Sequence, residues 1–108
     1  MKLYGLKTCD TCRKALAALK AAGLTVDYVD VRADGVAASD LRRFHDAFGE
    51  ALINKRSTTW RGLDAAARDG DPIDLLVENP TLMKRPVIDT GDKLHLGWGK
   101  DVQGALVG

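Results

Sequence analysis

The sequence is poor in the residues and patterns that mark several classes of protein. With two cysteines among 108 residues, it cannot build the multiple disulfides of small secreted domains. Its two histidines, His45 and His95, stand alone, so they offer no paired zinc-ligand motif. No apolar run approaches the roughly 18 residues of a membrane span, and the first residues are typical of a strand rather than a signal peptide. We therefore expect a cytoplasmic protein with no bound metal, no bound cofactor and no membrane partner.

The charge is nearly balanced, with 16 basic and 15 acidic side chains and a formal net charge of +1. This balance gives no global electrostatic attraction to nucleic acid or to an anionic membrane. A chain of this length can sustain one hydrophobic core. We therefore expect a single domain over residues 1–108, a monomer, and no nucleic-acid partner.

Both cysteines lie in Leu3–Leu19, where a short apolar run is followed by apolar residues at helical spacing. This pattern predicts a strand that passes directly into a helix, with Cys9 at the junction. The first N–H groups of a helix are unpaired and its dipole is positive there, so a thiolate is stabilised. Cysteine has an ordinary pKa of about 8.5, which a helix N-terminus, nearby cations such as Lys7 and Cys-x-x-Cys spacing can lower. We expect Cys9 to be an exposed, attacking thiolate.

Cys12 follows one turn later on a stripe with Leu16 and Leu19 that should face the core. It would be the thiol of higher pKa, able to resolve a mixed disulfide formed on Cys9. Two other interpretations remain open from the residues alone: both cysteines are inert small hydrophobic side chains, or they form half of a zinc site. The spacing and the strand-to-helix context favour redox or thiol chemistry over both.

The remaining pattern predicts an α/β protein with a mixed sheet. A strand over Thr25–Val31 should lie parallel to the first strand, because a helix connects the two. Pro86–Asp89 and Lys93–Leu96 flank a Gly-Asp turn, which predicts an antiparallel hairpin, and a closing helix follows Gly99. Strand-helix-strand followed by hairpin-helix is the order of a thioredoxin-like fold.

Residues 33–80 interrupt this order, and we interpret them as a helical insertion within the domain. Ser39 is expected to cap the first helix of the insertion, which Gly49 ends. Leu52–Arg61 is polar and basic and predicts a solvated loop. Pro72 suits the first position of a later helix.

Three motifs span nearly the whole chain. They are Tyr4–Ala15 (YGLKTCDTCRKA), Leu52–Arg61 (LINKRSTTWR) and Asn79–Val87 (NPTLMKRPV). Together, and in this order, they resemble the ArsC/Spx/YffB family, a set of thioredoxin-fold proteins that includes glutaredoxin-linked arsenate reductases. On these motifs the chain is identified as a member of that family.

The resemblance implies roles for several residues. Cys9 matches the nucleophile of the reductases, which forms a thiol-arsenate adduct that glutathione and glutaredoxin resolve. Arg85 matches the oxyanion-binding arginine, and Pro86 matches the cis-proline of thioredoxin folds. A guanidinium can hold a tetrahedral oxyanion through two parallel hydrogen bonds and would also favour the Cys9 thiolate. Further candidates for the same substrate-binding pocket are Lys7, Asn54 and Arg56.

The chain also departs from the reductases, which carry arginines where it has Asn54 and, after the hairpin, Leu96 and Gly97. Its Thr-Thr-Trp-Arg segment resembles the YffB-like branch, proposed to be glutathione-dependent thiol reductases. We therefore expect a thiol-dependent oxidoreductase in which Cys9 forms an adduct with a small oxyanion or a mixed disulfide, with glutathione as co-substrate and glutathione or glutaredoxin as partner.

Cys12 is a further departure, since the reductases usually have serine there. It matches the Cys-x-x-Cys of Spx, so the alternative is an Spx-like redox-sensing transcriptional regulator that binds RNA polymerase. A third interpretation is a family member that keeps the fold with little activity.

Overall fold

The computed structural model describes residues 1–107, which form two compact units. The first unit contains Met1–Val31 and the segment from Arg85 onward, and the second contains Arg32–Lys84. Each unit buries apolar side chains of its own. The reactive stretch expected around Cys9 therefore belongs to the first unit.

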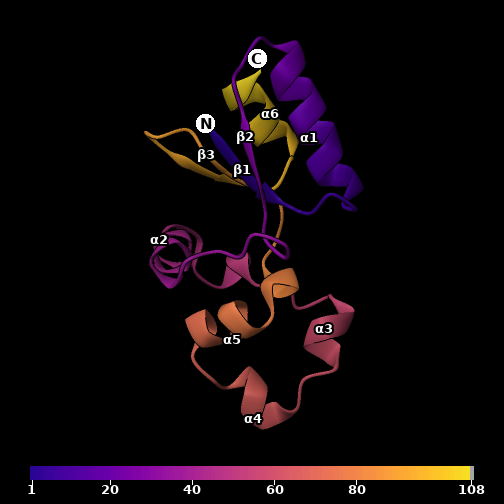
Figure 1. Cartoon of the computed structure of the whole chain (residues 1–108). Coiled ribbons are helices and arrows are strands. Elements are labelled where there is room, and N and C mark those ends of the chain that lie inside the picture. The colour runs from indigo at the N-terminus through magenta and orange to yellow at the C-terminus, as the bar shows by residue number, and fades with distance from the viewer. Residues whose placement is uncertain (108) are drawn as a thin grey trace. The chain divides into compact units, whose positions relative to one another are not determined.

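A four-stranded mixed sheet forms the first unit, in the order β2-β1-β3-β4 (Figure 1). β1 and β2 are parallel, while β3 pairs antiparallel with both β1 and β4. This is the thioredoxin-like arrangement that the strand-helix-strand and hairpin-helix pattern predicts. The strands are β1 (Lys2–Gly5), β2 (Asp27–Asp30), β3 (Val87–Asp89) and β4 (Leu94–Leu96).

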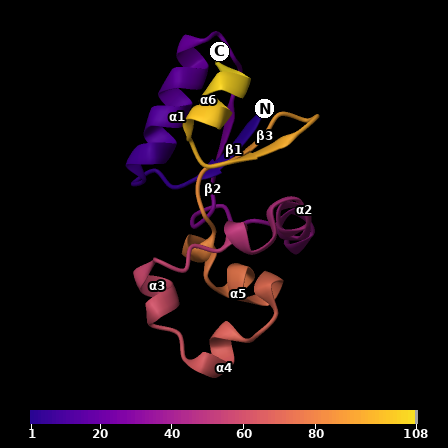
Figure 2. The ribbon, with the colours of Figure 1, turned by 180° about the vertical axis from the view of Figure 1, so that it is seen from behind.

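Two helices, α1 (Asp10–Ala21) and α6 (Lys100–Leu106), pack on the same face of this sheet (Figures 1 and 2). Gly23 ends α1 with φ of +83°, a left-handed conformation that favours glycine. Side chains from both helices and from the two central strands fill the core between them. The buried cluster consists of Leu3, Cys12, Ala15, Leu19, Ile88 and Val102.

The second unit consists of helices and short helical turns (Figure 1). α2 packs against α5, and Phe44 and Leu76 are among the side chains that this unit buries. Pro72 is the first residue of α5, as predicted, and Asp71 caps it by accepting from the N–H groups of Ile73 and Asp74. The elements are α2 (Ala38–Phe48), η1 (Gly49–Leu52), α3 (Thr58–Arg61), α4 (Ala65–Arg68), α5 (Pro72–Glu78) and η2 (Pro80–Leu82).

Two local predictions for this unit are wrong. Ser39 does not cap α2, because Ala37 occupies the cap position and its carbonyl accepts the first hydrogen bonds of the helix. Leu52–Arg61 is not entirely a loop, because Ser57 nucleates α3 by accepting from the backbone N–H of Trp60 at 3.1 Å. The side chain of Arg68 also donates to the carbonyls of Trp60 and Arg61 at the other end of α3, so both ends of this helical turn are held.

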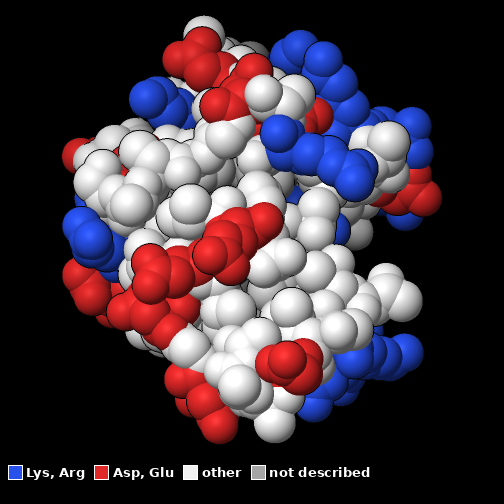
Figure 3. Space-filling model, turned by 60° about the horizontal axis from the view of Figure 1, so that its bottom comes forward, with Lys and Arg blue, Asp and Glu red and all other residues white. Residues whose placement is uncertain are grey.

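The face seen in Figure 3 carries charges of both signs among uncharged side chains. This mixture matches the formal net charge of +1. Across residues 1–107, every helix is too short or too polar to cross a bilayer.

Candidate functional site

Cys9 occupies the N-cap of α1, where β1 has just ended. Its backbone is extended and its carbonyl accepts the N–H of Arg13 at 3.0 Å, so the helix begins immediately after it. The side chain is only partly buried, and the sulfur is a free thiol. The strand-to-helix junction predicted from the sequence is therefore confirmed, with Cys9 at the positive end of the helix dipole.

The surroundings of Cys9 favour its thiolate. Burial is the largest single influence and opposes ionisation, but hydrogen bonds from the backbone N–H and the thiol of Cys12 outweigh it. Arg85 adds a hydrogen bond and a positive charge, and the pKa of Cys9 lies below its ordinary value as a result. The first proton that this cysteine pair loses is that of Cys9.

Cys12 is fully buried in the core cluster, as its place on the apolar stripe predicts. Burial, together with the adjacent Cys9 sulfur, raises the pKa of its thiol to about 11. The close approach of Cys12 to β1 requires a residue without a side chain there, since a Cβ on Gly5 would lie 2.7 Å from the Cys12 sulfur. The two thiols therefore differ in both exposure and acidity.

Arg85 and Pro86 return the chain to the first unit just before β3. The peptide bond between them is cis, as the family resemblance implied. Pro86 is buried, and its carbonyl accepts the N–H of Gly97 at 2.8 Å, which ties this turn to the end of β4. Arg85 is thereby held where its guanidinium reaches the Cys9 sulfur.

Two residues of β2, which the sequence reasoning did not identify, also face this region. Tyr28 and Asp30 lie opposite Leu3 and Gly5 in the parallel ladder, on the side of the sheet that α1 covers. Asp30 is buried, and the Tyr28 hydroxyl is buried without a hydrogen-bond partner among the described residues. Burial, followed by the charges of Cys12 and Asp30, raises the pKa of Tyr28 to about 12. Side chains at alternate positions of a strand share a face, so this two-residue period was the sequence signal that could have placed Tyr28 and Asp30 together.

A pocket of about 270 Å³ lies beside α1 in the same unit and is lined by Lys7, Arg13, Leu16 and Tyr28. Leu16 and Tyr28 give it apolar walls. Arg13 forms an ion pair with Asp10, whereas Lys7 forms none with any residue in the described part of the chain. Lys7 therefore offers an unpaired positive charge to an anionic molecule held near α1.

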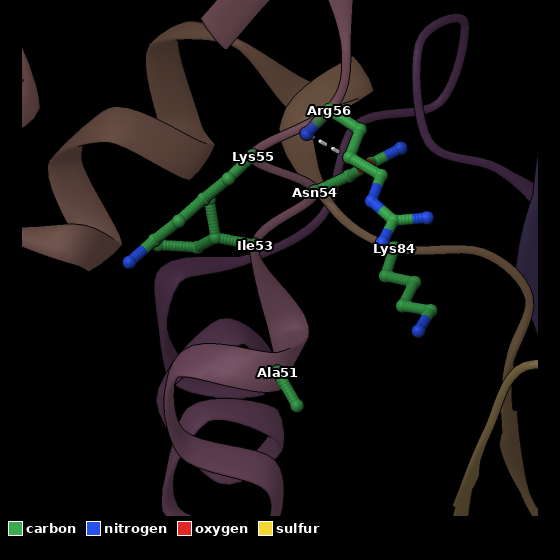
Figure 4. Close-up of a pocket in the computed structure, with 6 residues that line it drawn as sticks. All are labelled: Ala51, Ile53, Asn54, Lys55, Arg56 and Lys84. Carbon is green, nitrogen blue, oxygen red and sulfur yellow. Dashed lines mark hydrogen bonds between the residues drawn. The ribbon is translucent and has the colours of Figure 1, made fainter.

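Asn54 and Arg56, the other predicted substrate-binding residues, belong to the second unit. They line a separate pocket of about 460 Å³, which also includes Lys84 (Figure 4). Their participation in the chemistry of Cys9 stays a prediction. Within residues 1–107, no three His, Cys, Asp or Glu side chains are grouped so that they could hold a metal ion.

Comparisons with known proteins show the family and agree with the fold. The model of a protein family described as the ArsC family matches residues 4–105. The solved structure of a protein named YFFB (PA3664) superimposes with a TM-score of 0.91 at 34% identity, covering 99% of this chain and 98% of that one. The solution structure of an arsenate reductase (ArsC) related protein from Brucella melitensis gives a TM-score of 0.73 at 32% identity, covering 96% and 91% of the two chains.

A similarity to a regulator is also present. The global transcriptional regulator Spx of Streptococcus pyogenes is 30% identical over 110 aligned residues. The alignment covers 92% of this chain and 78% of Spx.

Proposed function

Because this chain belongs to the ArsC family, with a YffB-like structure and a relation to the arsenate reductases, we propose that it is a glutathione-dependent thiol oxidoreductase. Cys9 is the nucleophile of this reaction. The observation that carries the proposal is the asymmetry of the cysteine pair: a partly exposed Cys9 of lowered pKa lies against a buried Cys12 whose pKa is about 11. Thiolates are the reactive form of cysteine in disulfide exchange.

The proposed reaction begins with a mixed disulfide between glutathione and a second thiol. The Cys9 thiolate attacks the glutathione sulfur, so a Cys9–glutathione disulfide forms, the original disulfide bond breaks, and the released thiolate takes a proton from water. The thiolate of a second glutathione then attacks the glutathione sulfur of the adduct and regenerates Cys9. The substrate gains two electrons, and the two glutathiones leave as glutathione disulfide.

Arg85 and Cys12 assist Cys9 in this reaction. Arg85 donates to the Cys9 sulfur, so it stabilises the thiolate both before attack and when the adduct is resolved. At a pKa of about 11, only about one Cys12 in ten thousand is ionised at pH 7. We therefore assign resolution to external glutathione and give Cys12 the role of a hydrogen-bond donor to Cys9. Lys7 supplies a charge for a glutathione carboxylate beside α1.

The choice between a mixed disulfide and arsenate follows from the arginines. Arsenate reductases of the family carry three oxyanion-binding arginines. This chain has only the one at Arg85, and it has Asn54 and the Leu96–Gly97 pair in place of the other two. An amide offers no charge to an oxyanion, so fewer charge-assisted hydrogen bonds are available for arsenate. The mixed disulfide needs a single thiolate and is the substrate that we favour.

The test is a steady-state assay with glutathione, glutathione reductase and NADPH, using either the glutathione mixed disulfide of 2-mercaptoethanol or arsenate with added glutaredoxin. We expect turnover of the mixed disulfide, loss of that turnover in Cys9→Ser, and most of it retained in Cys12→Ser. Mass spectrometry should find a glutathione adduct on Cys9 alone. An inactive wild-type protein without an adduct would overturn the proposal. Faster turnover of arsenate than of the mixed disulfide would make arsenate the substrate in its place.

A second candidate function is an Spx-like redox switch that binds RNA polymerase, which the Cys-x-x-Cys pair and the similarity to Spx support. A peroxide could take two electrons and two protons from Cys9 and Cys12 and join their sulfurs, leaving water. Binding of the reduced and the oxidised chain to immobilised RNA polymerase separates the candidates. A redox-dependent affinity, together with no turnover in the glutathione assay, would favour the switch.

A further inference from the structure

The second unit contains a pocket rich in hydrogen-bond donors, to which the proposed reaction of Cys9 assigns no role. Its volume is about 460 Å³, within the usual range for small-ligand sites. Every lining residue belongs to the same unit. The lining consists of Ala51, Ile53, Asn54, Lys55, Arg56 and Lys84.

A short antiparallel bridge between Ile53 and Met83 builds this pocket. The N–H of Asn54 donates to the carbonyl of Leu82 at 2.8 Å, and the N–H of Lys84 donates to the carbonyl of Leu52 at 2.7 Å. These bonds hold Lys84 beside the segment 54–56, although the two lie far apart in the sequence.

The backbone around Asn54 determines on which side each side chain lies. Ile53 is extended, with φ of −94° and ψ of 123°, and residues 54–57 then form a turn in which the N–H of Ser57 donates to the carbonyl of Asn54 at 3.2 Å. Figure 4 shows Ile53 and Lys55 on one side of the segment, and Asn54 and Arg56 on the other side together with Lys84. Three donor side chains are therefore gathered on one side.

The positive charges on the two sides of the segment differ in whether a ligand could bind them. Lys55 lies 3.8 Å from a carboxylate oxygen of Glu50, and its ammonium lies 5.7 Å from the centre of the Trp60 ring. The side chains of Arg56 and Lys84 make no hydrogen bond or ion pair with any residue in the described range 1–107. Two positive charges on the same side are therefore open to a ligand.

Asn54 is oriented by its neighbour. Its side-chain oxygen accepts the backbone N–H of Arg56 at 3.1 Å, so the amide nitrogen of Asn54 is left as the outward donor (Figure 4). A guanidinium binds two oxygens of one anion in a fork, an ammonium adds a point charge, and an amide adds one more donor.

We propose that Asn54, Arg56 and Lys84 form a binding site for a phosphate group, carried by a small phosphate monoester. Two open cationic side chains balance the double charge of a phosphate dianion. The methyl group of Ala51, which also lines the pocket, would contact the organic part of an ester. Inorganic phosphate carries the same phosphate group and is the other ligand that such a site could bind.

Titration of ¹⁵N-labelled full-length protein, followed by two-dimensional NMR at constant ionic strength, tests the site. The probes are glycerol 3-phosphate, inorganic phosphate and, as a control for unspecific ion binding, chloride. We expect saturable shifts of the amides of Asn54, Arg56 and Lys84 with both phosphates and none with chloride. Tighter binding of the ester identifies a monoester as the source, and equal binding identifies free phosphate.

Two substitutions and two matched controls make the test specific. Arg56→Gln and Lys84→Gln each remove one charge-assisted contact and should weaken phosphate binding by about tenfold or more. Arg42→Gln and Lys93→Gln remove exposed charges outside the pocket and should change the affinity by less than about twofold. Retained spectra show that each variant is folded.

The proposal fails if phosphate produces no saturable shifts at these amides, or if the pocket variants bind as tightly as their controls. The readout does not involve Cys9. An active thiol oxidoreductase without phosphate binding, or a phosphate-binding protein without thiol activity, would therefore separate this proposal from the proposed function.

Discussion

Replacement of Gly5 by alanine probes the packing beneath the cysteine pair. The new Cβ would lie 2.7 Å from the sulfur and 3.0 Å from the Cβ of Cys12, and 3.2 Å from a methyl carbon of Leu3. Non-bonded carbon atoms pack best at about 3.5 to 4.0 Å, so all three contacts are too short. Cys12 and Leu3 are both completely buried, which leaves them little room to move.

Overpacking of this kind costs about 1 to 3 kcal/mol of unfolding free energy. For a chain of about 100 residues, such a loss lowers the Tm by about 5 to 20 °C. Displacement of Cys12 should also weaken its hydrogen bonds to Cys9 and so raise the pKa of Cys9. Urea and thermal unfolding followed by circular dichroism would measure the first effect, and pH-dependent alkylation the second.

Gly104→Ala is the matched control, because a Cβ at this position of α6 would meet no atom within 4 Å. Alanine is a better helix former than glycine, so this variant should be more stable by about 0.5 to 1 kcal/mol. In a double-mutant cycle, Cys12→Ala should recover part of the cost of Gly5→Ala, because it removes the closest contact. A Gly5→Ala variant as stable as the wild type would refute this account of the packing.

Three other substitutions or conditions give further predictions. Tyr28→Phe removes a buried hydroxyl without a partner among the described residues, so thermal unfolding should show a Tm that is unchanged or higher, and a loss above about 1 kcal/mol would mean that the hydroxyl is satisfied. The pKa of Cys12 in the folded protein, about 11, lies above the ordinary 8.5, so the thiol loses its proton at lower pH in the unfolded chain than in the folded one. The free energy of unfolding should therefore fall as the pH rises from about 8.5 to 11, and the fall should be smaller in Cys12→Ala. Asp71→Ala removes the cap of α5 and should cost about 1 kcal/mol by urea unfolding, whereas Asp69→Ala should cost less.

Local patterns in the sequence predict the parts of the fold that local forces determine. The change from an apolar run to helical spacing locates Cys9 at the start of α1, and the stripe shared with Leu16 and Leu19 predicts the burial of Cys12. The Gly-Asp turn predicts the hairpin of β3 and β4. The cis bond before Pro86 could be expected only from the family resemblance, since no local pattern specifies it.

Contacts between distant segments could not be predicted in this way. The register of β1 on β2 places Asp30 opposite Gly5, and it follows from side-chain packing across the whole sheet. The bridge between Ile53 and Met83, which brings Lys84 next to Arg56, joins segments about thirty residues apart through backbone hydrogen bonds. Neither the register of two strands nor the bridge between two distant segments can be read from the sequence of one segment alone.

The pKa of the Cys9 thiol tests the central claim most directly. It can be measured from the pH dependence of alkylation by iodoacetamide, with peptide mass spectrometry to separate Cys9 from Cys12, in the wild type and in Arg85→Ala, Cys12→Ala and Arg42→Ala. The account predicts a wild-type pKa below the ordinary 8.5 that rises when Arg85 or Cys12 is replaced and stays unchanged in Arg42→Ala. A wild-type pKa at or above 8.5, or the same value in all four proteins, would contradict it.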